Sequence, residues 1–515
     1  MNLAQFFEHW QITENPFRGE EARHDAIFAR MGASTPESGL PGASTHSDFE
    51  KVLGDLDAPS TSIVFGEKGA GKTAMRLQLA AHIGAHNNAS GDRKVFLVPY
   101  DDLNAHLDHF ARFSADKSKD NPFQSMRLVD HLDAILSIGT GRVVNALLPG
   151  PDHPPAAKLG DECVRVARKM PGMLRRDLLL LQALYDTNDP TGARTQRLAK
   201  LLRLPSGGHS ALTIIALWLG WIPSVALFVW VYFFLDLEGW VLNAGQLGAG
   251  VLLILWMALL VKAHLLDRLV LARLAGKVSR QLRMVPRGSR GALGSLARLP
   301  RSVLGSGELP ITDSDEQRYE MIARLRRVIN EFGFSGILVV IDRVDEPTLV
   351  HGDPERMRSI IWPLMNNKVL QLTGVGFKML LPIELRHALF KESSAFFQEA
   401  RLDKQNLIER LSWTGAMLYD LCNARLAVCR EAHVEPIALV DLFEEDVSRQ
   451  DVVEALGAMM QPRDAFKFLY RCLSEHCANV TSDEGKWRIA RHVLEQVRKE
   501  EADRVMQLQR GIRPA

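Results

Sequence analysis

Thr61-Ser-Ile-Val-Phe-Gly-Glu-Lys-Gly-Ala-Gly-Lys-Thr73 is the stretch of sequence that decides the fold. It begins with a run rich in β-branched residues and ends with the pattern G-x-x-x-x-G-K-T. Apolar residues then recur at helical spacing, beginning with Met75. A strand, a glycine-rich loop and a helix in this order predict a phosphate-binding P-loop, the Walker A motif.

The residue types of this loop suit a nucleoside triphosphate. Gly66 and Gly71 allow the backbone to curl so that its N–H groups face phosphate oxygens at a helix N-terminus. Lys72 can reach the β- and γ-phosphates and act in catalysis, and the Thr73 hydroxyl can bind Mg²⁺. An ordinary glycine-rich turn is the alternative. The expected nucleotide-binding residues are Gly66, Glu67, Lys68, Gly69, Ala70, Gly71, Lys72 and Thr73.

A second acidic strand is expected at residues 336–346, Gly-Ile-Leu-Val-Val-Ile-Asp-Arg-Val-Asp-Glu. The continuous apolar run predicts a strand buried on both faces of a parallel sheet. Asp342 follows it at the carboxyl end, where α/β sheets bind ligands, so we assign Asp342 to the Mg²⁺ shell. Asp345 or Glu346 is expected to orient the attacking water; the alternative for this pair is a solvated turn before Pro347.

Two further strands are expected. One is Lys94 to Asp101, and the other is Phe377 to Arg386. The end of the second offers Glu384 as a sensor near the γ-phosphate and Arg386 as an arginine finger. The alternative for these two residues is a surface pair at a strand end.

Length and composition bound the remaining choices. A chain of 515 residues is too long for one core, and two to four units are expected. A net charge of +1 gives the whole molecule no general affinity for polyanions. Five cysteines without a C-x-x-C pair indicate reduced thiols, not a disulfide scaffold. The first ten residues lack the basic and apolar regions of a signal peptide.

The two Walker motifs are separated by a large insertion. Residues 74–341 number 268, whereas one βαβ unit takes roughly thirty. Residues 211–235 carry no charge, and at about 1.5 Å per residue they cover about 37 Å, enough to cross a bilayer. Residues 247–261 are apolar again. We therefore expect a transmembrane hairpin; the alternatives are a buried helical hairpin and a monotopic re-entrant one.

Flanking charges predict the orientation of this hairpin. The connection at 236–243 holds Asp236 and Glu238 but no Lys or Arg, whereas both outer flanks are basic. By the positive-inside rule both flanks, and both Walker motifs, face the cytoplasm from an inner or plasma membrane. Residues 262–301 hold ten Lys or Arg and one acid. Anionic lipid is the simpler partner for this segment, and nucleic acid is the alternative.

These motifs together resemble the AAA+/STAND group of P-loop ATPases. In that group an acidic pair follows the Walker B aspartate at the spacing seen from Asp342 to Glu346, and a sensor arginine often opens a lid helix. The resemblance assigns that last role to Arg463, in Gln461-Pro462-Arg463. The membrane segments between the Walker motifs are similar to those of the KAP family. One departure is Arg343, where KAP proteins usually have a second aspartate.

The resemblance implies signalling or defence roles, including the exclusion of phage. No [NT]-K-x-D guanine motif occurs, which favours ATP over GTP, with Mg²⁺ as the metal. The leading hypothesis is a membrane-anchored ATPase acting as a nucleotide-dependent switch. The alternatives are a membrane-tethered ATPase that handles nucleic acid and a non-hydrolysing scaffold whose hairpin supports a homo-oligomer. No residue indicates a protein partner.

The expected fold class is α/β, a P-loop NTPase whose parallel sheet carries helices on both faces, with a two-helix transmembrane insertion and a C-terminal helical lid. The expected divisions are an N-terminal segment (1–46), the first part of the ATPase core with a helical extension (47–205), the hairpin (206–266), a basic juxtamembrane linker (267–310), the second part of the core (311–400) and the lid (401–515).

Overall fold

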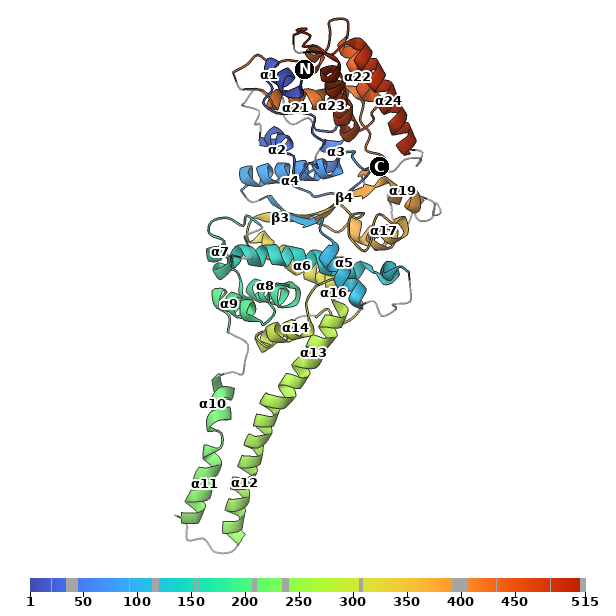
Figure 1. Cartoon of the computed structure of the whole chain (residues 1–515). Coiled ribbons are helices and arrows are strands. Elements are labelled where there is room, and N and C mark those ends of the chain that lie inside the picture. Colours follow the sequence, from blue (N-terminus) through green and yellow to red (C-terminus); the bar gives the residue numbers. More distant parts are fainter. Residues whose placement is uncertain are drawn as a thin grey trace. The chain divides into compact units, whose positions relative to one another are not determined.

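The protein is described here by a computed structural model (Figure 1). The described residues are 1–19, 21–33, 45–91, 93–113, 120–151, 154, 157–205, 211–233, 240–304, 309–390, 406–431, 433–481 and 483–509. The chain forms two compact units. Unit 1 combines Met1–Asn104 with Ser335–Ala515, and unit 2 is Ala105–Phe334.

A five-stranded parallel sheet forms the centre of unit 1. Its strands lie in the order β2-β3-β4-β1-β5. They are β1 Ser62–Gly66, β2 Lys94–Tyr100, β3 Phe334–Ile341, β4 Val375–Pro382 and β5 Asn406–Ile408. In the register, Val64 of β1 lies opposite Leu380 of β4 and Ile408 of β5. The predicted α/β class with a parallel sheet is confirmed, and the glycine-rich loop and Asp342 follow strands at the same edge.

Helices bury the apolar strands of this sheet. Helix α4 (Lys72–Ala89) follows the glycine-rich loop, and its Met75, Leu79 and Ile83 pack on strand residues that include Val64 and Leu338. Helix α3 (Phe49–Leu53) shares this core. The other helices around the sheet are α17 Pro354–Ile361, η4 Trp362–Leu364, α18 Asn367–Leu370 and α19 Ile383–Phe390.

The strand predicted from Phe377 to Arg386 ends at Pro382, so the expected strand-end position of Glu384 and Arg386 is wrong. Both residues lie in α19. Proline at the last strand position cannot donate a ladder hydrogen bond, and a glutamate in the first helical turn interacts favourably with the helix dipole. These two local preferences explain why the chain turns helical there.

A helical bundle completes unit 1, and it joins the two ends of the chain. The C-terminal part provides α21 Gly415–Val428, η6 Leu439–Leu442, α22 Arg449–Gly457, α23 Pro462–Asn479 and α24 Arg491–Gln509. The N-terminal helices α1 (Leu3–His9) and α2 (Ala26–Ala33) share its core through residues such as Phe6 and Ile27. The Thr13 amide also donates to the carbonyl oxygen of Cys429 at 2.8 Å. The sequence did not predict this association.

Unit 2 is helical. Its helices are α5 Asn104–Phe113, which begins at the last residue of unit 1's first segment, η2 Pro122–Ser125, α6 Leu128–Leu147, α7 Cys163–Lys169, α8 Gly172–Tyr185, α9 Ala193–Leu201, α10 Ala211–Leu219, α11 Ile222–Phe233, α12 Trp240–Val261, a π-helical turn at Lys262–Leu266, α13 Asp267–Gln281, α14 Ser289–Leu296, α15 Arg301–Leu304 and α16 Asp315–Asn330. Residues 267–310, expected to form a basic juxtamembrane linker, thus include α13, α14 and α15.

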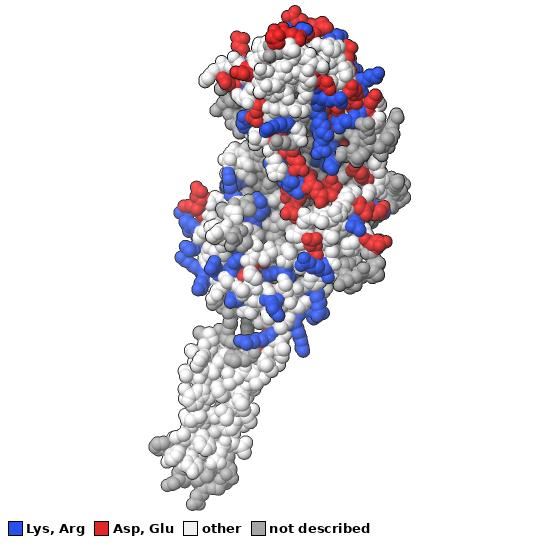
Figure 2. Space-filling view, in the orientation of Figure 1, with Lys and Arg blue, Asp and Glu red and all other residues white. Residues whose placement is uncertain are grey.

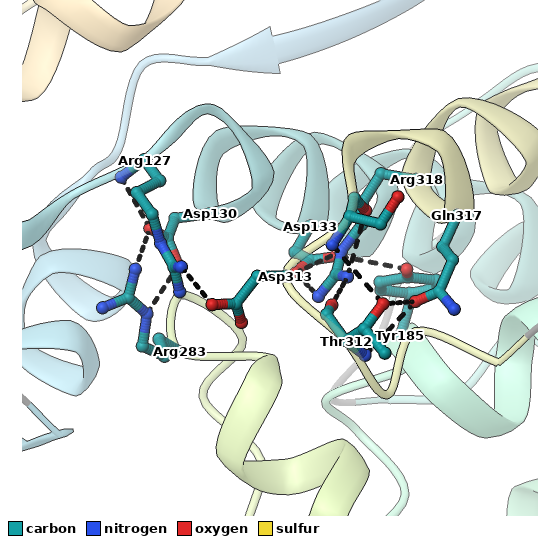
Figure 3. Close-up of polar contacts among 10 residues, drawn as sticks. Arg127, Asp130, Asp133, Tyr185, Arg283, Thr312, Asp313, Gln317 and Arg318 are labelled. Atoms are coloured by element: carbon teal, nitrogen blue, oxygen red, sulfur yellow. Dashed lines mark hydrogen bonds and ion pairs between the residues drawn. The ribbon is translucent and has the colours of Figure 1, made fainter.

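Buried ion pairs join α6 to later parts of unit 2 (Figure 3). The Arg318 guanidinium of α16 contacts Asp133 of α6 at 3.1 Å, and the Tyr185 hydroxyl donates to the same carboxylate at 3.1 Å. One turn earlier, Asp130 pairs with Arg283 at 2.6 Å. Burial raises the pKa of Asp133 to about 7, against the opposing effect of Arg318. The pairs fix how α6, α8, α16 and the end of α13 lie together.

The apolar hairpin of α10, α11 and α12 is the most exposed apolar part of unit 2 (Figure 2). Its helices are held together by a bond from the Ser224 hydroxyl to the Ala249 carbonyl oxygen at 2.6 Å. Large side chains point outward; Trp218 is 77% exposed, Phe233 71% and Leu247 70%. The α12 helix runs through the π-helical turn into α13 without a break in helical backbone.

No single helix among the described residues combines the length and apolar composition that a bilayer crossing needs. The helices Thr213–Leu219 and Ile222–Phe233 meet the requirement only as a pair, with a bend of 42° between them, and Gln246–Val261 is shorter. The predicted insertion of two transmembrane helices is therefore not supported. Residues 206–210 and 234–239, which include the first five residues of the expected hairpin and half of its acidic connection, lie outside the described residues.

Candidate nucleotide-binding site

A cavity of about 490 Å³ opens at the carboxyl edge of the sheet in unit 1. Its walls come from four segments far apart in the sequence: the glycine-rich loop with the start of α4, the turn after β3, the N-terminal segment, and helices α21 and α23. Among the predicted site residues, those that line it are Lys68, Gly69, Gly71, Lys72, Thr73, Asp342, Asp345, Glu346 and Arg463.

The glycine-rich loop has the backbone that its sequence predicts. Gly69 and Gly71 have φ values of 101° and 92°, which favour glycine. The Lys72 ammonium folds back over the loop and donates to the carbonyl oxygens of Gly66 at 2.7 Å and Glu67 at 3.0 Å. A phosphate at this position would take over these donors. Burial lowers the pKa of Lys72, and the charge of Asp345 is the largest opposing effect.

Asp342 lies beside the loop, as predicted. Its side chain is 1% exposed, and its Oδ2 atom accepts from the Thr73 hydroxyl at 3.3 Å. Burial raises the pKa of Asp342 to about 6, while Arg76 and Lys72 oppose that rise. A hydroxyl and a carboxylate in contact suit one edge of a Mg²⁺ shell, with phosphate oxygens and water completing it. The described residues contain no cluster of three ligands that could hold a metal alone.

One neighbour of Asp342, Arg76, was not predicted. The Nε atom of Arg76, one turn into α4, lies 3.3 Å from the Asp342 carboxylate. The same guanidinium pairs with Asp101, which follows β2. Arg76 thus links the ends of two strands to the helix that begins at the loop. The position of Asp101 at the end of a predicted strand was a sequence signal for a residue near the site. Its pairing with Arg76 could not be predicted, because it depends on β2 lying next to β3 in the sheet.

The two acidic residues after Asp342, Asp345 and Glu346, have different surroundings. Glu346 forms an ion pair with Arg343 at 2.5 Å. Arg343 itself has a φ of 61°, a left-handed conformation that is uncommon outside glycine. Asp345 is half-buried, and its charge acts on Lys72 more strongly than that of Asp342 does. Of the two carboxylates, Asp345 is the one whose charge raises the pKa of Lys72.

Glu384 and Arg386 do not line the cavity. Arg386 pairs with Glu409 at 2.6 Å, and Glu384 is exposed in the first turn of α19, from which its charge still acts on Lys72. Arg463 does line it, at the start of α23 after the helix-opening Pro462. A Cβ atom added at Gly69 would lie 3.0 Å from the Cβ of Arg463, so the arginine packs directly on the glycine-rich loop.

The segment after β5 also supports the loop, and no sequence motif indicated it. The Trp413 indole donates to the Ala70 carbonyl oxygen at 2.8 Å, and Arg410 pairs with Glu67 at 2.5 Å. The His46 ring packs edge-on against Trp413 with ring centroids 4.9 Å apart. These contacts cover the outer side of the loop.

The helical bundle of unit 1 also lines the cavity. Arg425 of α21 forms a buried ion pair with Asp25 at 2.6 Å and stacks over Phe466 of α23 at 4.5 Å. All three residues line the cavity, together with Phe28. The cavity is therefore lined both by the glycine-rich loop and by aromatic and paired charged side chains.

Comparisons of the chain with models of protein families, with characterised proteins and with solved structures find no significant match.

Proposed function

We propose that the protein is an ATPase that binds ATP and Mg²⁺ in the cavity of unit 1. The observation that carries the proposal is the contact of Thr73 with Asp342. The two residues are 269 positions apart in the sequence, yet their oxygens lie 3.3 Å apart beside the Lys72 ammonium. Both motifs that a P-loop ATPase needs thus meet at one edge of a parallel sheet.

Each of these residues has a separate role in phosphoryl transfer. The loop amides and Lys72 hold the β- and γ-phosphates, and Thr73 and Asp342 hold Mg²⁺, which neutralises charge on the phosphate oxygens. Asp345 orients the attacking water, since it lines the cavity and its charge acts on Lys72, while Glu346 is paired with Arg343. Arg463, packed on Gly69, stabilises charge that develops on the γ-phosphate. This arrangement supports the resemblance to the AAA+/STAND group.

The base of ATP belongs beside the helical bundle in the same cavity. Phe28 and Phe466 offer apolar and aromatic surface there, and the paired Asp25 and Arg425 offer polar atoms. The N-terminal segment and the C-terminal bundle would both contact the nucleotide. ATP binding would therefore stabilise their association with the sheet.

We further propose that the hairpin of unit 2 anchors the ATPase in a membrane, as in the KAP family that the chain resembles. Its exposed Trp, Phe, Leu and Ile side chains form a far larger apolar surface than a soluble monomer usually carries. The bent pair of α10 and α11 would sit in the bilayer, with α12 packed beside it. The nucleotide site and the hairpin together suggest a membrane-anchored ATPase that acts as a nucleotide-dependent switch.

The test is ATP turnover by the purified chain in the presence of vesicles. Wild-type protein should hydrolyse ATP with a requirement for Mg²⁺, and Asp342→Asn should bind ATP but lose Mg²⁺-dependent turnover. Equal rates of Mg²⁺-dependent ATP turnover in the wild-type protein and the Asp342→Asn variant would rule out the proposed site. ATP binding without any turnover would favour a nucleotide-binding scaffold.

A further inference from the structure

Four helices of unit 2 pack on one another where the apolar hairpin meets the rest of the unit (Figure 1). Helix α13 continues the α12 helix, and α14 packs on α13, α8 and α9. The contact of α14 with α9 is close, because a Cβ added at Gly192 would lie 2.3 Å from the Gly294 carbonyl oxygen. The four helices form one packed support from which the hairpin projects.

These helices expose positive charge almost without compensation (Figure 2). Acidic side chains on the same helices are Asp177, which is buried and paired with Arg324, and the half-buried Asp267. None of the exposed cations pairs with a carboxylate in the described part of the chain. We call this set the basic collar: Arg176, Arg197, Lys200, Arg203, Lys262, Arg268, Arg273, Lys277, Arg280 and Arg290.

We propose that the basic collar binds the headgroups of an anionic lipid bilayer. The inference rests on the proposed membrane anchor and adds a second, electrostatic contact with the same bilayer. Ten like charges on adjoining helices repel one another unless a negative partner covers them. Six of the ten lie in the basic segment 262–301 that the sequence indicates. The other four come from α8, α9 and the residues just after α9, so the fold assembles the collar from separate segments.

The order of apolar and basic residues along one helix places the collar at headgroup depth. The apolar stretch of α12, Gln246–Val261, is shorter than the hydrocarbon thickness of about 30 Å, and it ends where the basic residues begin. Lys262 follows at once, then Arg268 and Arg273 on the same continuous helix. If α12 occupies the hydrocarbon layer, these cations lie at the surface of the bilayer.

Lipid fits the collar better than nucleic acid does. The only aromatic residue of α8, α9, α13 and α14 is Tyr185, which is buried. The collar therefore offers no exposed ring on which a base could stack. It is instead continuous with exposed apolar residues such as Leu269 and Val270, which suit the boundary between headgroups and acyl chains.

The experiment is lysine acetylation footprinting of the full-length protein reconstituted in vesicles. One set of vesicles holds phosphatidylcholine alone, and the other also holds phosphatidylglycerol. Lys200 and Lys277 report on the collar, while the exposed Lys467 and Lys499 of unit 1 are internal controls. We expect acetylation of Lys200 and Lys277 to slow at least about fivefold in anionic vesicles, the factor that one cation near such a surface contributes. High salt should restore the rate.

A charge variant tests whether the collar acts as a set. Arg197→Gln, Arg273→Gln and Arg280→Gln together should restore acetylation of Lys200 and Lys277 in anionic vesicles. The matched control, Arg112→Gln, Arg168→Gln and Arg498→Gln, removes three exposed cations outside the collar and should leave the protection intact.

Flotation of the same samples separates this proposal from the membrane anchor. Protein that floats with both kinds of vesicle, but shows equal acetylation in both, retains the anchor and overturns the collar. Protein that floats with neither overturns both. Protection of Lys200 and Lys277 by duplex DNA, without protection by anionic vesicles, would also overturn the proposal and identify nucleic acid as the partner.

Discussion

At the scale of single residues, Lys72 has the clearest role. Its ammonium spans the loop carbonyl oxygens of Gly66 and Glu67, and no other ammonium lines the described cavity except that of Lys68. Lys72→Ala should weaken ATP binding by about 2 kcal/mol or more, about thirtyfold, because a bond between a cation and phosphate is lost. Isothermal titration measures this. Lys499→Ala, at an exposed position on α24 that does not line the cavity, is the control, and an unchanged affinity of Lys72→Ala would contradict the P-loop assignment.

The two carboxylates after Asp342 should differ in effect. Asp345→Asn is expected to lower turnover by about a hundredfold or more with little change in ATP affinity, because the substitution removes the proposed water-orienting carboxylate. Glu346→Gln should keep turnover within a few fold of the wild-type rate, since this substitution only breaks an exposed ion pair with Arg343. Steady-state turnover with both variants decides between them; the reverse ranking would assign the role to Glu346.

Asp342 predicts a pH dependence of metal binding. Burial raises its pKa from 3.8 to about 6, so the folded protein holds this proton more tightly than the unfolded chain does. The group's contribution to stability therefore falls as pH rises from about 4 to about 6. Mg²⁺ needs the ionised carboxylate, so Mg²⁺-dependent ATP affinity should rise across about pH 5 to 7. Titration calorimetry across this range tests it, and a slope that survives in Asp342→Asn would point to another group.

The sequence predicted the residues of the site that belong to motifs and missed those that depend on the strand order. Thr73 and Asp342 were predicted to share a metal because each ends a recognisable pattern, and their oxygens do meet. Arg76 carries no pattern, since an arginine on a helix is usually solvated. It reaches both Asp342 and Asp101 only because β2 lies next to β3 in the sheet.

At the scale of elements, local signals failed where a segment's partner is distant in sequence. The N-terminal helices looked like an isolated segment, because nothing in Phe6 or Ile27 shows that the core they join is formed by the last hundred residues. The strand predicted from Phe377 was extended four residues too far, to Arg386, because Ile383 and Leu385 fit a strand or a helix equally well.

The hairpin leads to a prediction about sidedness. If it inserts from the cytoplasmic side, a cysteine at Asn243, near the start of α12, should react with an impermeant maleimide added to intact cells. A cysteine at Lys277, exposed on α13, should react only after lysis. Both are made with Cys163 replaced by Ser, because the other four cysteines are buried. Labelling of Lys277→Cys from outside would contradict the orientation, and equal labelling at both positions would contradict insertion.

At the scale of the whole molecule, the nucleotide site belongs to one unit although its residues come from both ends of the chain. Unit 1 combines residues 1–104 with 335–515, and every residue that lines the cavity lies in it. Unit 2 is an insertion between β2 and β3 that carries the hairpin and the basic collar. Nucleotide binding and membrane binding are therefore expected to be separable by deletion.

The last prediction tests that separation. Replacing residues 206–270 with a short Gly and Ser linker removes the hairpin and the exposed Leu265, Leu266, Leu269 and Val270 next to it. The cut ends can be joined because α9 and α13 both pack on α14. The variant should stay in solution without detergent and bind ATP within about threefold of the full chain, since no wall of the cavity is removed. Calorimetry and gel filtration measure both properties.

Lys72→Ala in the shortened chain is the control, and it should lose ATP binding as it does in the full chain. A shortened chain that is monomeric and keeps its helical circular dichroism, yet does not bind ATP, would show that the hairpin contributes to the nucleotide site. In that case the hairpin would be part of the ATPase itself and not a removable membrane anchor.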